Sequence, residues 1–449
     1  MRFYYYLATS ILLSFISAGL IELYGTGERY FHLDATGFSL GESYYFSDRI
    51  DKVSNSSIST YWKSNLTRFT FSTELYTNIS GIRDKDINVY PFSFIFPINK
   101  FNTIGLGLIP FTRSTQAAME TSGYYIGYGS SDFFTSAMHS YSTYEFTGGI
   151  SDFYLVLSTK INKNNSFGVK LNKLFGNQLQ TKKTIISSLD YSSSNSIEFS
   201  EEDSTYQIVS NQFNGYSVQL DWMLEMDKHL VGFSITSIGP IEITHRSYYN
   251  LLSEDSEFLD IESANDLINY DSFIHYSTII EDDVDKWSYI PKIFNRINDY
   301  SIGYHYYNSN SSGIILEFHR NDLFNNISTI SEGINIFNNI KPWSNSYKLG
   351  LYKRYSNTSI GFWDTVYLRI GGHLKQLFFQ ESDGENYRGI DIAITTGIGI
   401  KIKNSNLIGL GIKFGRFRND FFNNNEYYMN AMLSFEIGNR WFEKARSKK

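Results

Sequence analysis

The side chains best placed for chemistry are five charged residues that alternate with apolar ones. They are Arg68, Glu74, Arg369, His373 and Lys375. Successive side chains of a β-strand point to opposite faces, so the apolar neighbours of these residues would occupy one face and the charges the other. The sequence therefore predicts a charged, inward-facing surface that either contacts a ligand or only pairs its own charges and holds water.

No pattern for catalysis or metal binding accompanies these residues. The eight histidines lack the spacing of a zinc site, and no serine lies in a hydrolase-type elbow. Segment 254–266, EDSEFLDIESAND, clusters carboxylates without the glycine and ligand spacing of a calcium loop, so we expect a solvated or lipopolysaccharide-facing loop. We expect no enzyme activity, cofactor or metal; an enzyme built on an outer-membrane barrel is the distant alternative.

The strand pattern is clearest from Phe146 to Gly176. Apolar residues recur at every second position on both sides of a short Asn-rich turn at 162–165, and this period indicates two strands with one apolar face. Lys173 shares the apolar face. Because a charge at the bilayer midplane costs ~2–4 kcal/mol, the pattern predicts an interface position or a β-bulge there.

Similar hairpins recur along the chain and give about fourteen strands. Short turns fall at one end of the strands, and long loops, at 113–137, 251–295 and 321–343, fall at the other, with a Ser-rich acidic loop at 191–203. Outer-membrane barrels have this asymmetry, with the long loops outside the cell. The sequence thus predicts an all-β fold, a transmembrane antiparallel β-barrel of about fourteen strands, in preference to a soluble β-sandwich.

Composition agrees with such a barrel. The chain has 35 Tyr, 36 Phe and 33 Gly but 6 Pro and no Cys, which favours strands and aromatic girdles. Without cysteine there is no disulfide or thiolate metal site, which is compatible with an oxidising periplasm. A net charge of -7 argues against a nucleic-acid partner.

Four regions are expected. Residues 1–19 have the basic end, apolar run and small residues of a signal peptide, and the run is too short for a spanning anchor. Residues 20–64 lack alternation and form either a plug (hatch) or a surface extension. Residues 65–438 form the barrel. Residues 439–449 form a short basic tail, in which Trp441 and Phe442 would serve as an internal signal to the barrel-assembly machinery.

Glycines on the predicted inner face indicate where another segment packs. They are Gly105, Gly107, Gly168, Gly397, Gly399, Gly409 and Gly411. Glycine within a strand often marks the close approach of another backbone. A barrel of this size is too wide for its own side chains to fill, so the sequence predicts that segment 20–64 packs on these glycines, blocks water flow and leaves a small apolar pocket.

Several stretches resemble the FadL-type family of outer-membrane proteins. The resemblance lies in FPINKFNTIGLGLIPFT, in GGISDFYLVLSTKINKNNSFGVKLNKLFGN, and in YLRIGGHLKQLFF with ITTGIGIKIKNSNLIGLGIKFG. It implies a fourteen-stranded barrel plugged by its N-terminal segment that transports hydrophobic compounds. PorV-type barrels associated with type IX secretion look similar in the same stretches. Lys63-Ser64-Asn65 stands where the family usually has Asn-Pro-Ala.

The resulting functional expectation is a barrel in the outer membrane of a Gram-negative bacterium that transports a hydrophobic or amphipathic small molecule. The alternatives are a PorV-like interaction barrel, associated with protein secretion or cell-surface attachment, and a passive porin. Expected partners are outer-membrane lipid and lipopolysaccharide, the barrel-assembly machinery, a hydrophobic ligand and a secretion partner.

Overall fold

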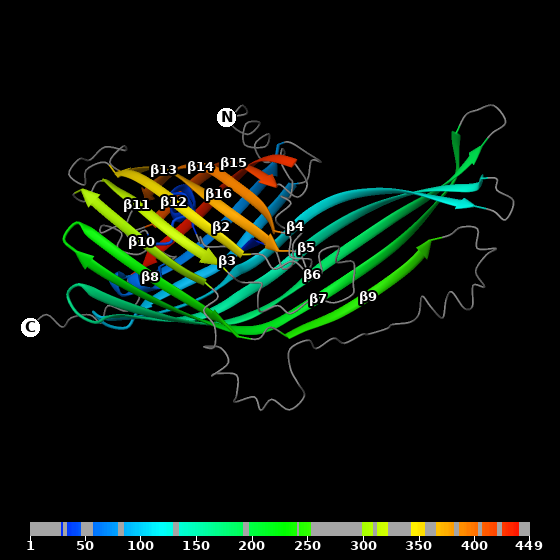
Figure 1. Cartoon of the computed structure of the whole chain (residues 1–449). Helices are drawn as coiled ribbons and strands as arrows, with labels where there is room; N and C mark the ends of the chain where they lie inside the picture. Colours follow the sequence, from blue (N-terminus) through cyan, green and yellow to red (C-terminus); the bar gives the residue numbers. More distant parts are fainter. Residues whose placement is uncertain are drawn as a thin grey trace, which may run out of the picture.

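The computed structural model (Figure 1) describes part of the chain, and the described ranges are as follows. The described residues are 28–29, 34–45, 57–79, 85–128, 134–191, 197–239, 242–252, 299–308, 312–321, 343–354, 365–380, 386–402, 406–419 and 424–439. The expected signal peptide at 1–19, the acidic segment at 254–266 and almost all of the loops predicted at 251–295 and 321–343 lie outside these residues. So does the basic tail beyond Asn439.

Fourteen antiparallel strands close into a barrel, which confirms the predicted fold class. They are β2 (Thr67–Asn78), β3 (Lys85–Pro97), β4 (Asn102–Tyr128), β5 (Phe134–Lys160), β6 (Asn165–Tyr191), β7 (Ile197–Met226), β8 (His229–Ile238), β10 (Asp299–Asn308), β11 (Ser312–Asn321), β12 (Trp343–Arg354), β13 (Val366–Gln380), β14 (Asn386–Ile402), β15 (Asn406–Asn419) and β16 (Asn424–Asn439). Each pairs with its neighbour in the ring, and β16 pairs with β2 to close it.

Side chains alternate strictly across the wall. On β14, Ile392 and Ile394 are 53% and 64% exposed, whereas Asp391, Ala393 and Thr395 between and beside them are buried. The outward residues predicted from the sequence follow this rule: all are exposed or half-exposed, namely Ile392, Ile394, Leu410, Ile412, Leu433 and Phe435. The predicted register of β14, β15 and β16 is therefore confirmed.

Of the two alternatives predicted for Lys173, the β-bulge is wrong, and the position at the membrane interface stays a prediction. Strand β6 keeps an unbroken register with β5 and β7 on both sides of this residue. The Lys173 ammonium lies 4.1 Å from the ring centroid of Tyr216 and donates a hydrogen bond to the Asn214 side chain. A neighbouring aromatic face and an amide oxygen thus stabilise an outward lysine without any change of strand register.

Two predicted loops are mostly strand. Residues 113–137, expected as a loop, continue β4 to Tyr128 and resume in β5 at Phe134, and β7 begins at Ile197, inside the loop expected at 191–203. Together with β9 (Glu242–Leu252), which pairs with the first half of β7, strands β4 to β7 form a sheet that projects far beyond the barrel (Figure 1). A strand that contacts water on both faces needs no apolar residue at every second position. The sequence of this region lacks that alternation, and a loop was therefore predicted.

The wall parts between β3 and β4. Their pairing joins Ser93–Pro97 to Thr103–Gly107, and Pro91 forms a bulge in the pairing of β3 with β2. Beyond Gly107, among the described residues, β4 pairs on this side with β1 (Glu28–Arg29), which lies against Thr112 and Arg113. The N-terminal segment thus contributes two residues to the edge that β3 leaves open.

The other described N-terminal elements lie inside the ring. They are the helix α2 (Ala35–Ser39), which packs on β13 to β16, and the 3-10 helix η2 (Ile58–Lys63), which packs on β4 to β7. Asp34 caps α2 by accepting a hydrogen bond from the Gly37 amide at 2.9 Å. Within the described part of the chain, no helix has both the length and the apolar character needed to cross a membrane.

Candidate functional site

The candidate functional site is the N-terminal segment docked inside the barrel. Residues 34–45 and 57–64 are the described stretches, and we call them together the hatch. Every hatch residue except Glu42, Trp62 and Lys63 is buried. Of the segment predicted as a plug, residues 34–45 and 57–64 therefore lie inside the barrel, whereas β1 pairs with β4 at the wall; the boundaries at 20 and 64 stay a prediction.

Barrel side chains satisfy the backbone of the hatch. Six hatch amides donate to polar side chains from five strands: Ala35 to Ser434, Gly41 to Thr395, Tyr44 and Tyr45 to Glu317, Ile58 to Asp221, and Trp62 to Ser158. A buried amide without a partner costs ~1–3 kcal/mol, so these acceptors fix where the segment can lie. The hatch is thus docked by hydrogen bonds at many points around the wall.

Glu317 on β11 makes the densest of these contacts. Its carboxylate accepts from the amide of Tyr44 at 2.8 Å and of Tyr45 at 2.7 Å, and from the Ser43 hydroxyl at 2.5 Å. His319 lies 3.0 Å from the same carboxylate on its other side. Charge-assisted hydrogen bonds of this kind are about twice as strong as neutral ones, so Glu317 is the strongest single anchor described.

Asp221 on β7 joins the two hatch stretches. Its Oδ2 atom accepts from the Tyr44 hydroxyl at 2.8 Å and from the Ile58 amide at 3.1 Å. Burial, and then the Asp221 charge, hold the pKa of Tyr44 well above its usual value of 10, so this hydroxyl keeps its proton and remains a donor. One carboxylate therefore ties the end of the first stretch to the start of the second.

A strained turn follows α2. Gly41 has φ +75°, and a Cβ atom there would lie 2.7 Å from the Leu349 carbonyl oxygen, so only glycine fits. Glu42 also has positive φ, at 63°, which is uncommon for a residue with a side chain. Lys413 contacts its carboxylate at 2.7 Å and Lys348 donates to its carbonyl at 2.7 Å. These two lysines hold the turn against the wall.

The first stretch lies along a track of four pairs of glycines that face each other across neighbouring strands, and all of these glycines except Gly399, which meets Arg369, adjoin the hatch. The pairs are Gly397 with Gly411, Gly399 with Gly409, Gly350 with Gly371, and Gly232 with Gly303. Along this track, a Cβ on Gly411 would lie 2.7 Å from the Phe38 ring, and one on Gly409 would lie 3.0 Å from the Ala35 Cβ. Side chains here would displace the hatch.

The structure places five of the seven predicted glycines against the hatch. Gly397, Gly409 and Gly411 adjoin α2; a Cβ on Gly105 would lie 2.7 Å from the Tyr61 ring, and one on Gly168 would lie 2.9 Å from Ile58. The nearest neighbours of the other two belong to the barrel: Tyr154 and Phe92 for Gly107, and Arg369 for Gly399. Those two glycines make room for wall side chains instead.

Gly232 and Gly303 were missed by the sequence argument. They pair directly across β8 and β10, and the ring of Tyr45 lies on both, with its hydroxyl 2.8 Å from the Ser301 hydroxyl. Both glycines have inward parity on their strands, the same signal that identified the other seven. Gly350 and Gly371, which meet Leu40, carry that signal too.

The five predicted charged residues all point inward and are buried, but they do not form one site. Arg68 pairs with Glu436, and Glu74 accepts from the Asn430 amide at 2.7 Å, both on the β2–β16 side of the wall. Arg369, His373 and Lys375 lie on β13. Their role in binding a ligand stays a prediction.

Among them His373 is the one that the structure brings to the hatch. Its Nε2 atom lies 3.0 Å from Asp391, and its Nδ1 atom lies 3.8 Å from the Glu42 carboxylate. Arg369 lies against Gly399 and 5.7 Å from the Tyr367 ring, nearer the short-turn end of β13. His373 therefore belongs to the group of charges that surrounds the strained turn.

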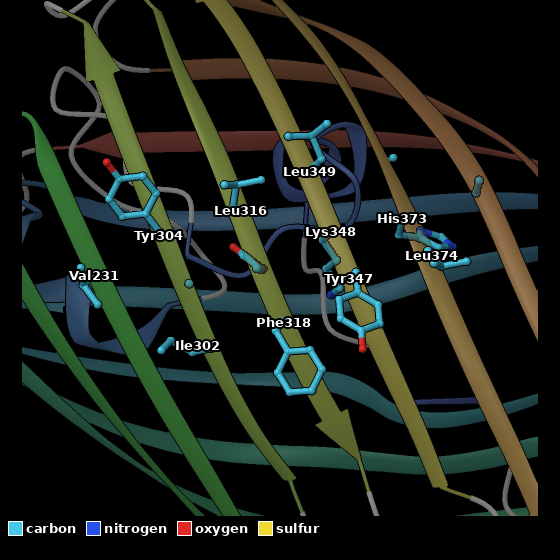
Figure 2. Close-up of a pocket in the computed structure, with 14 residues that line it drawn as sticks. Val231, Ile302, Tyr304, Leu316, Phe318, Tyr347, Lys348, Leu349, His373 and Leu374 are labelled. Carbon is cyan, nitrogen blue, oxygen red and sulfur yellow. The ribbon is translucent and has the colours of Figure 1, made fainter.

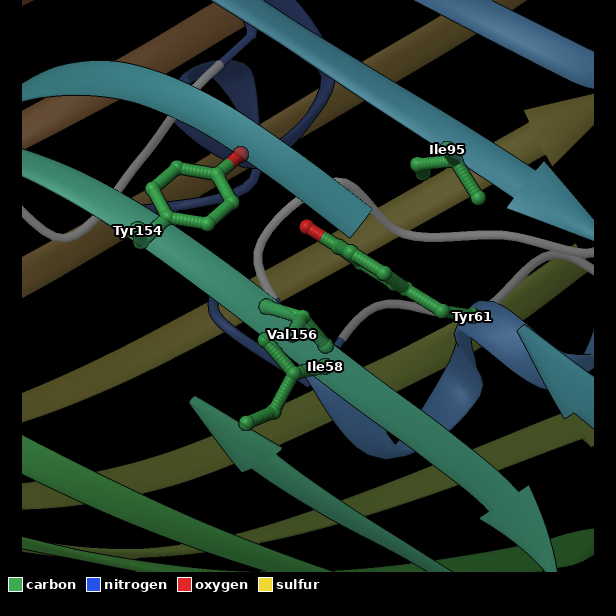
Figure 3. Packing of buried hydrophobic residues seen from close by; sticks show 5 residues of the cluster. All are labelled: Ile58, Tyr61, Ile95, Tyr154 and Val156. Carbon is green, nitrogen blue, oxygen red and sulfur yellow. The ribbon is translucent and has the colours of Figure 1, made fainter. Parts of the chain in front are cut away.

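The second hatch stretch is held mainly by apolar packing. Figure 3 shows Ile58 and Tyr61 of η2 against Tyr154 and Val156 of β5, with Ile95 of β3 beside them. Burial raises the pKa of Tyr61 well above its usual value, so it too remains neutral. The first stretch thus has the larger number of bonds to carboxylates and hydroxyls, whereas the second combines this apolar cluster with the bonds of Ile58 to Asp221 and Trp62 to Ser158.

The contacts of this site dock the hatch to the wall. Its charged groups face the hatch or each other, and the described residues contain no cluster of three or more histidine or acidic side chains that could hold a metal ion. The fold and the site together define a plugged fourteen-stranded barrel.

No family model matches the sequence, and no curated protein matches it. Among solved structures, the chain is similar to a FadL homologue from Pseudomonas aeruginosa, with TM-score 0.52, 9% identity, and coverage of 93% of this chain and 100% of that one. It also matches the toluene transporter TodX from Pseudomonas putida (TM-score 0.42, 10% identity, 91% and 99% coverage) and TbuX from Ralstonia pickettii (0.44, 7%, 92% and 99%). The fold is that of the FadL-type barrels.

Proposed function

We propose that this protein transports a hydrophobic or amphipathic small molecule across the outer membrane of a Gram-negative bacterium, with the hatch as its gate. The observation that carries the proposal is the hatch itself. It is buried on glycine tracks inside a closed barrel and docked by six amide hydrogen bonds to wall side chains. A segment held in this way closes the lumen and can leave it without unfolding the wall.

The outer surface supports a membrane location. Large apolar side chains are exposed on strands all around the ring, including Leu155, Leu171, Ile302, Ile370 and Ile394, each at least half exposed. Soluble proteins rarely expose contiguous apolar surface on this scale, whereas a barrel in a bilayer presents an apolar band about 25 Å tall. The absence of polar residues at these positions fits contact with lipid.

The parted wall supports an apolar cargo. Above Gly107, β4 separates from β3 and takes β1 as its partner on that side. A molecule that prefers hydrocarbon to water gains by leaving a lumen sideways into the bilayer, and such a gap offers that route. A passive porin needs an open aqueous path instead, which the buried hatch opposes. The FadL-type fold is consistent with the same assignment.

Conductance in planar bilayers tests the gate. The intact protein should carry little steady current, and deletion of residues 20–55 behind the signal peptide should open a large, weakly selective channel. A heat-dependent gel shift should show that both barrels are folded. If the intact barrel conducts as well as the deletion variant, the hatch does not close the lumen, and the protein is better described as a passive porin.

A second candidate function is an interaction barrel that holds a secreted or surface partner. One observation favours it: the sheet formed by β4 to β7 and β9 projects beyond the ring and offers a platform that transport does not require (Figure 1). Removing the projecting parts of β4 and β5, by joining Arg113 to Gly148, tests it. Lost partner capture in this variant, together with an intact barrel that takes up no apolar compounds, would favour this function over transport.

A further inference from the structure

A band of arginines encircles part of the outer wall at the end opposite the short turns. Arg320 on β11, Arg388 on β14, and Arg416 and Arg418 on β15 all have outward parity. The register brings them together, because Arg418 pairs with Ile390 and Arg416 with Ile392, just below Arg388 on β14. Arg320 is three strands away from Arg388, but it belongs to the same register row as Arg418, because Arg320 pairs with Asn345, Asn345 with Gln376, and Gln376 with Ile390.

Aromatic rings hold two of these guanidinium groups in place. Arg320 lies 4.6 Å from the ring of Trp343, which stacks on Phe378 at 3.8 Å, and Arg388 lies 5.9 Å from Phe378 on the other side. The four side chains form one continuous stack across β11 to β14. A guanidinium fixed against a ring keeps its donors pointing outward in a fork that matches phosphate oxygens.

An apolar hollow of about 690 Å³ lies next to this stack on the same outer face. Its wall includes Leu316, Phe318, Tyr347 and Leu349, which Figure 2 shows on the near side of the strands, with the hatch behind them. Gly372 contributes to the hollow because it places no side chain on the outer face beside Leu349. Acyl chains fit such a surface.

The position of the arginines relative to the apolar hollow indicates which kind of ligand would bind. Phe318 of the hollow is two residues before Arg320 on β11, so the basic stack lies directly beyond the apolar hollow, toward the projecting sheet. A ligand with acyl chains and phosphates side by side would place its chains in the hollow and its phosphates on the arginines. In the proposed outer-membrane orientation, this height is that of the outer leaflet.

We propose that this face binds a phosphorylated, acylated glycolipid of the outer leaflet, with its phosphates on Arg320 and Arg388 and one acyl chain in the hollow beside Leu349. The inference rests on the proposed membrane location and is independent of whether the hatch gates transport. Arg416 and Arg418 provide the second basic group, on β15, that a headgroup with two phosphates requires.

Binding to purified full-length protein in detergent tests the site, measured by native mass spectrometry with three probes: bisphosphorylated lipid A, the same lipid without phosphates, and phosphatidylglycerol. The bisphosphorylated glycolipid should bind best. The double variant Arg320→Gln/Arg388→Gln should weaken its binding about tenfold or more, because charge-assisted hydrogen bonds are lost. The matched control Lys353→Gln/Lys228→Gln, at the short-turn end, should bind like the native protein.

A second variant tests the hollow without touching the charges. Leu349 is 45% exposed, so Leu349→Trp fills the hollow with little effect on folding, which the gel shift checks. This variant should bind the glycolipid more weakly, and its low current in planar bilayers should show that the hatch stays closed. Equal binding of phosphatidylglycerol and glycolipid, or native-like glycolipid binding by the arginine double variant, would overturn the proposal. A hatch deletion that fails to conduct would refute the transport function and leave this lipid result unchanged.

Discussion

At Glu317, one buried carboxylate holds three consecutive residues of the hatch. Two of its hydrogen bonds come from backbone amides, so the contact depends on where the chain runs and not on which side chains it carries. Asp221 does the same for the junction between the two stretches. The hatch is therefore positioned by a few polar residues on distant strands.

Replacing Glu317 should open the gate. Glu317→Ala removes two charge-assisted hydrogen bonds to amides that stay buried, and we expect docking to weaken by about 3–6 kcal/mol. That change is enough to move a mostly closed gate to a mostly open one. Single-channel recordings should show frequent openings. Glu436→Gln, an inward glutamate paired with Arg68 on the wall, serves as the control and should stay closed.

The paired glycines under Tyr45 allow a second substitution. Gly303→Val places a branched side chain where the Tyr45 ring lies, and the ring must move. The barrel should still fold, because valine suits a strand. Hydrogen exchange of the Tyr44 and Tyr45 amides should rise by about tenfold or more as their bonds to Glu317 are strained. Unchanged protection would show that the slot does not position the hatch.

Tyrosine ionisation predicts a gate that loosens in alkali. Burial raises the pKa values of Tyr44, Tyr45 and Tyr61 above 10 in the docked state, whereas a released hatch exposes them to water and an ordinary pKa. Docking stability is therefore complete below pH 10 and falls as the pH rises above it.

Bilayer current recorded between pH 8 and 11 measures this effect. It should be low and constant up to about pH 9.5 and then rise. Tyr45→Phe removes one of the three ionisable groups and should make the rise shallower. If the current stays constant to pH 11 while the barrel remains folded, ionisation of these tyrosines does not loosen the hatch.

Among the elements, the first hatch stretch crosses the strands from β16 to β8 along paired glycines. The sequence predicted four of these positions, Gly397, Gly399, Gly409 and Gly411, because inward parity and residue type are local properties. It could not show which glycines face each other, since pairs such as Gly232 and Gly303 depend on register between strands far apart in the chain. Glu317 and Asp221 were missed for the same reason.

A covalent link can test whether α2 must move. A Cβ on Gly409 would lie 3.0 Å from the Ala35 Cβ, close to the ~3.8 Å of a disulfide. Because the chain has no cysteine, Ala35→Cys/Gly409→Cys can form only the intended bond. Oxidised protein should lose about tenfold or more of its uptake of an apolar dye into proteoliposomes, and reductant should restore it. Uptake that ignores the redox state would show that α2 stays in place.

For the whole molecule, the alternation of side chains made the barrel predictable, because a two-residue period is imposed wherever one face meets lipid and the other a packed interior. In the proposed membrane location, that constraint ends where the strands leave the bilayer. Residues beyond Arg113 on β4 lack it, and the sequence there predicted a loop although the backbone continues as strand. Strands could thus be predicted from the sequence only as far as the alternating apolar residues of the wall extend.

Orientation is testable on intact cells with single cysteines in the cysteine-free chain. Asn164→Cys lies in a short turn, and Tyr128→Cys lies at the far end of β4. A membrane-impermeant maleimide should label Tyr128→Cys at least about tenfold more than Asn164→Cys, because the bilayer shields the periplasmic turns. Equal labelling after permeabilisation is the control. The opposite preference would invert the topology.

Strands β4 to β7 run for 27 to 30 residues, which at about 3.3 Å per residue is roughly 90–100 Å, whereas the hydrocarbon layer is about 30 Å thick. In the proposed orientation, more than half of this sheet stands above the lipid. It would overtop the mouth of the barrel and reach through the sugar coat of the cell. A phage, an antibody or a neighbouring cell would then meet this sheet before anything else in the protein, and immune or phage pressure would fall on the projecting parts of these strands, beyond the barrel that holds the hatch.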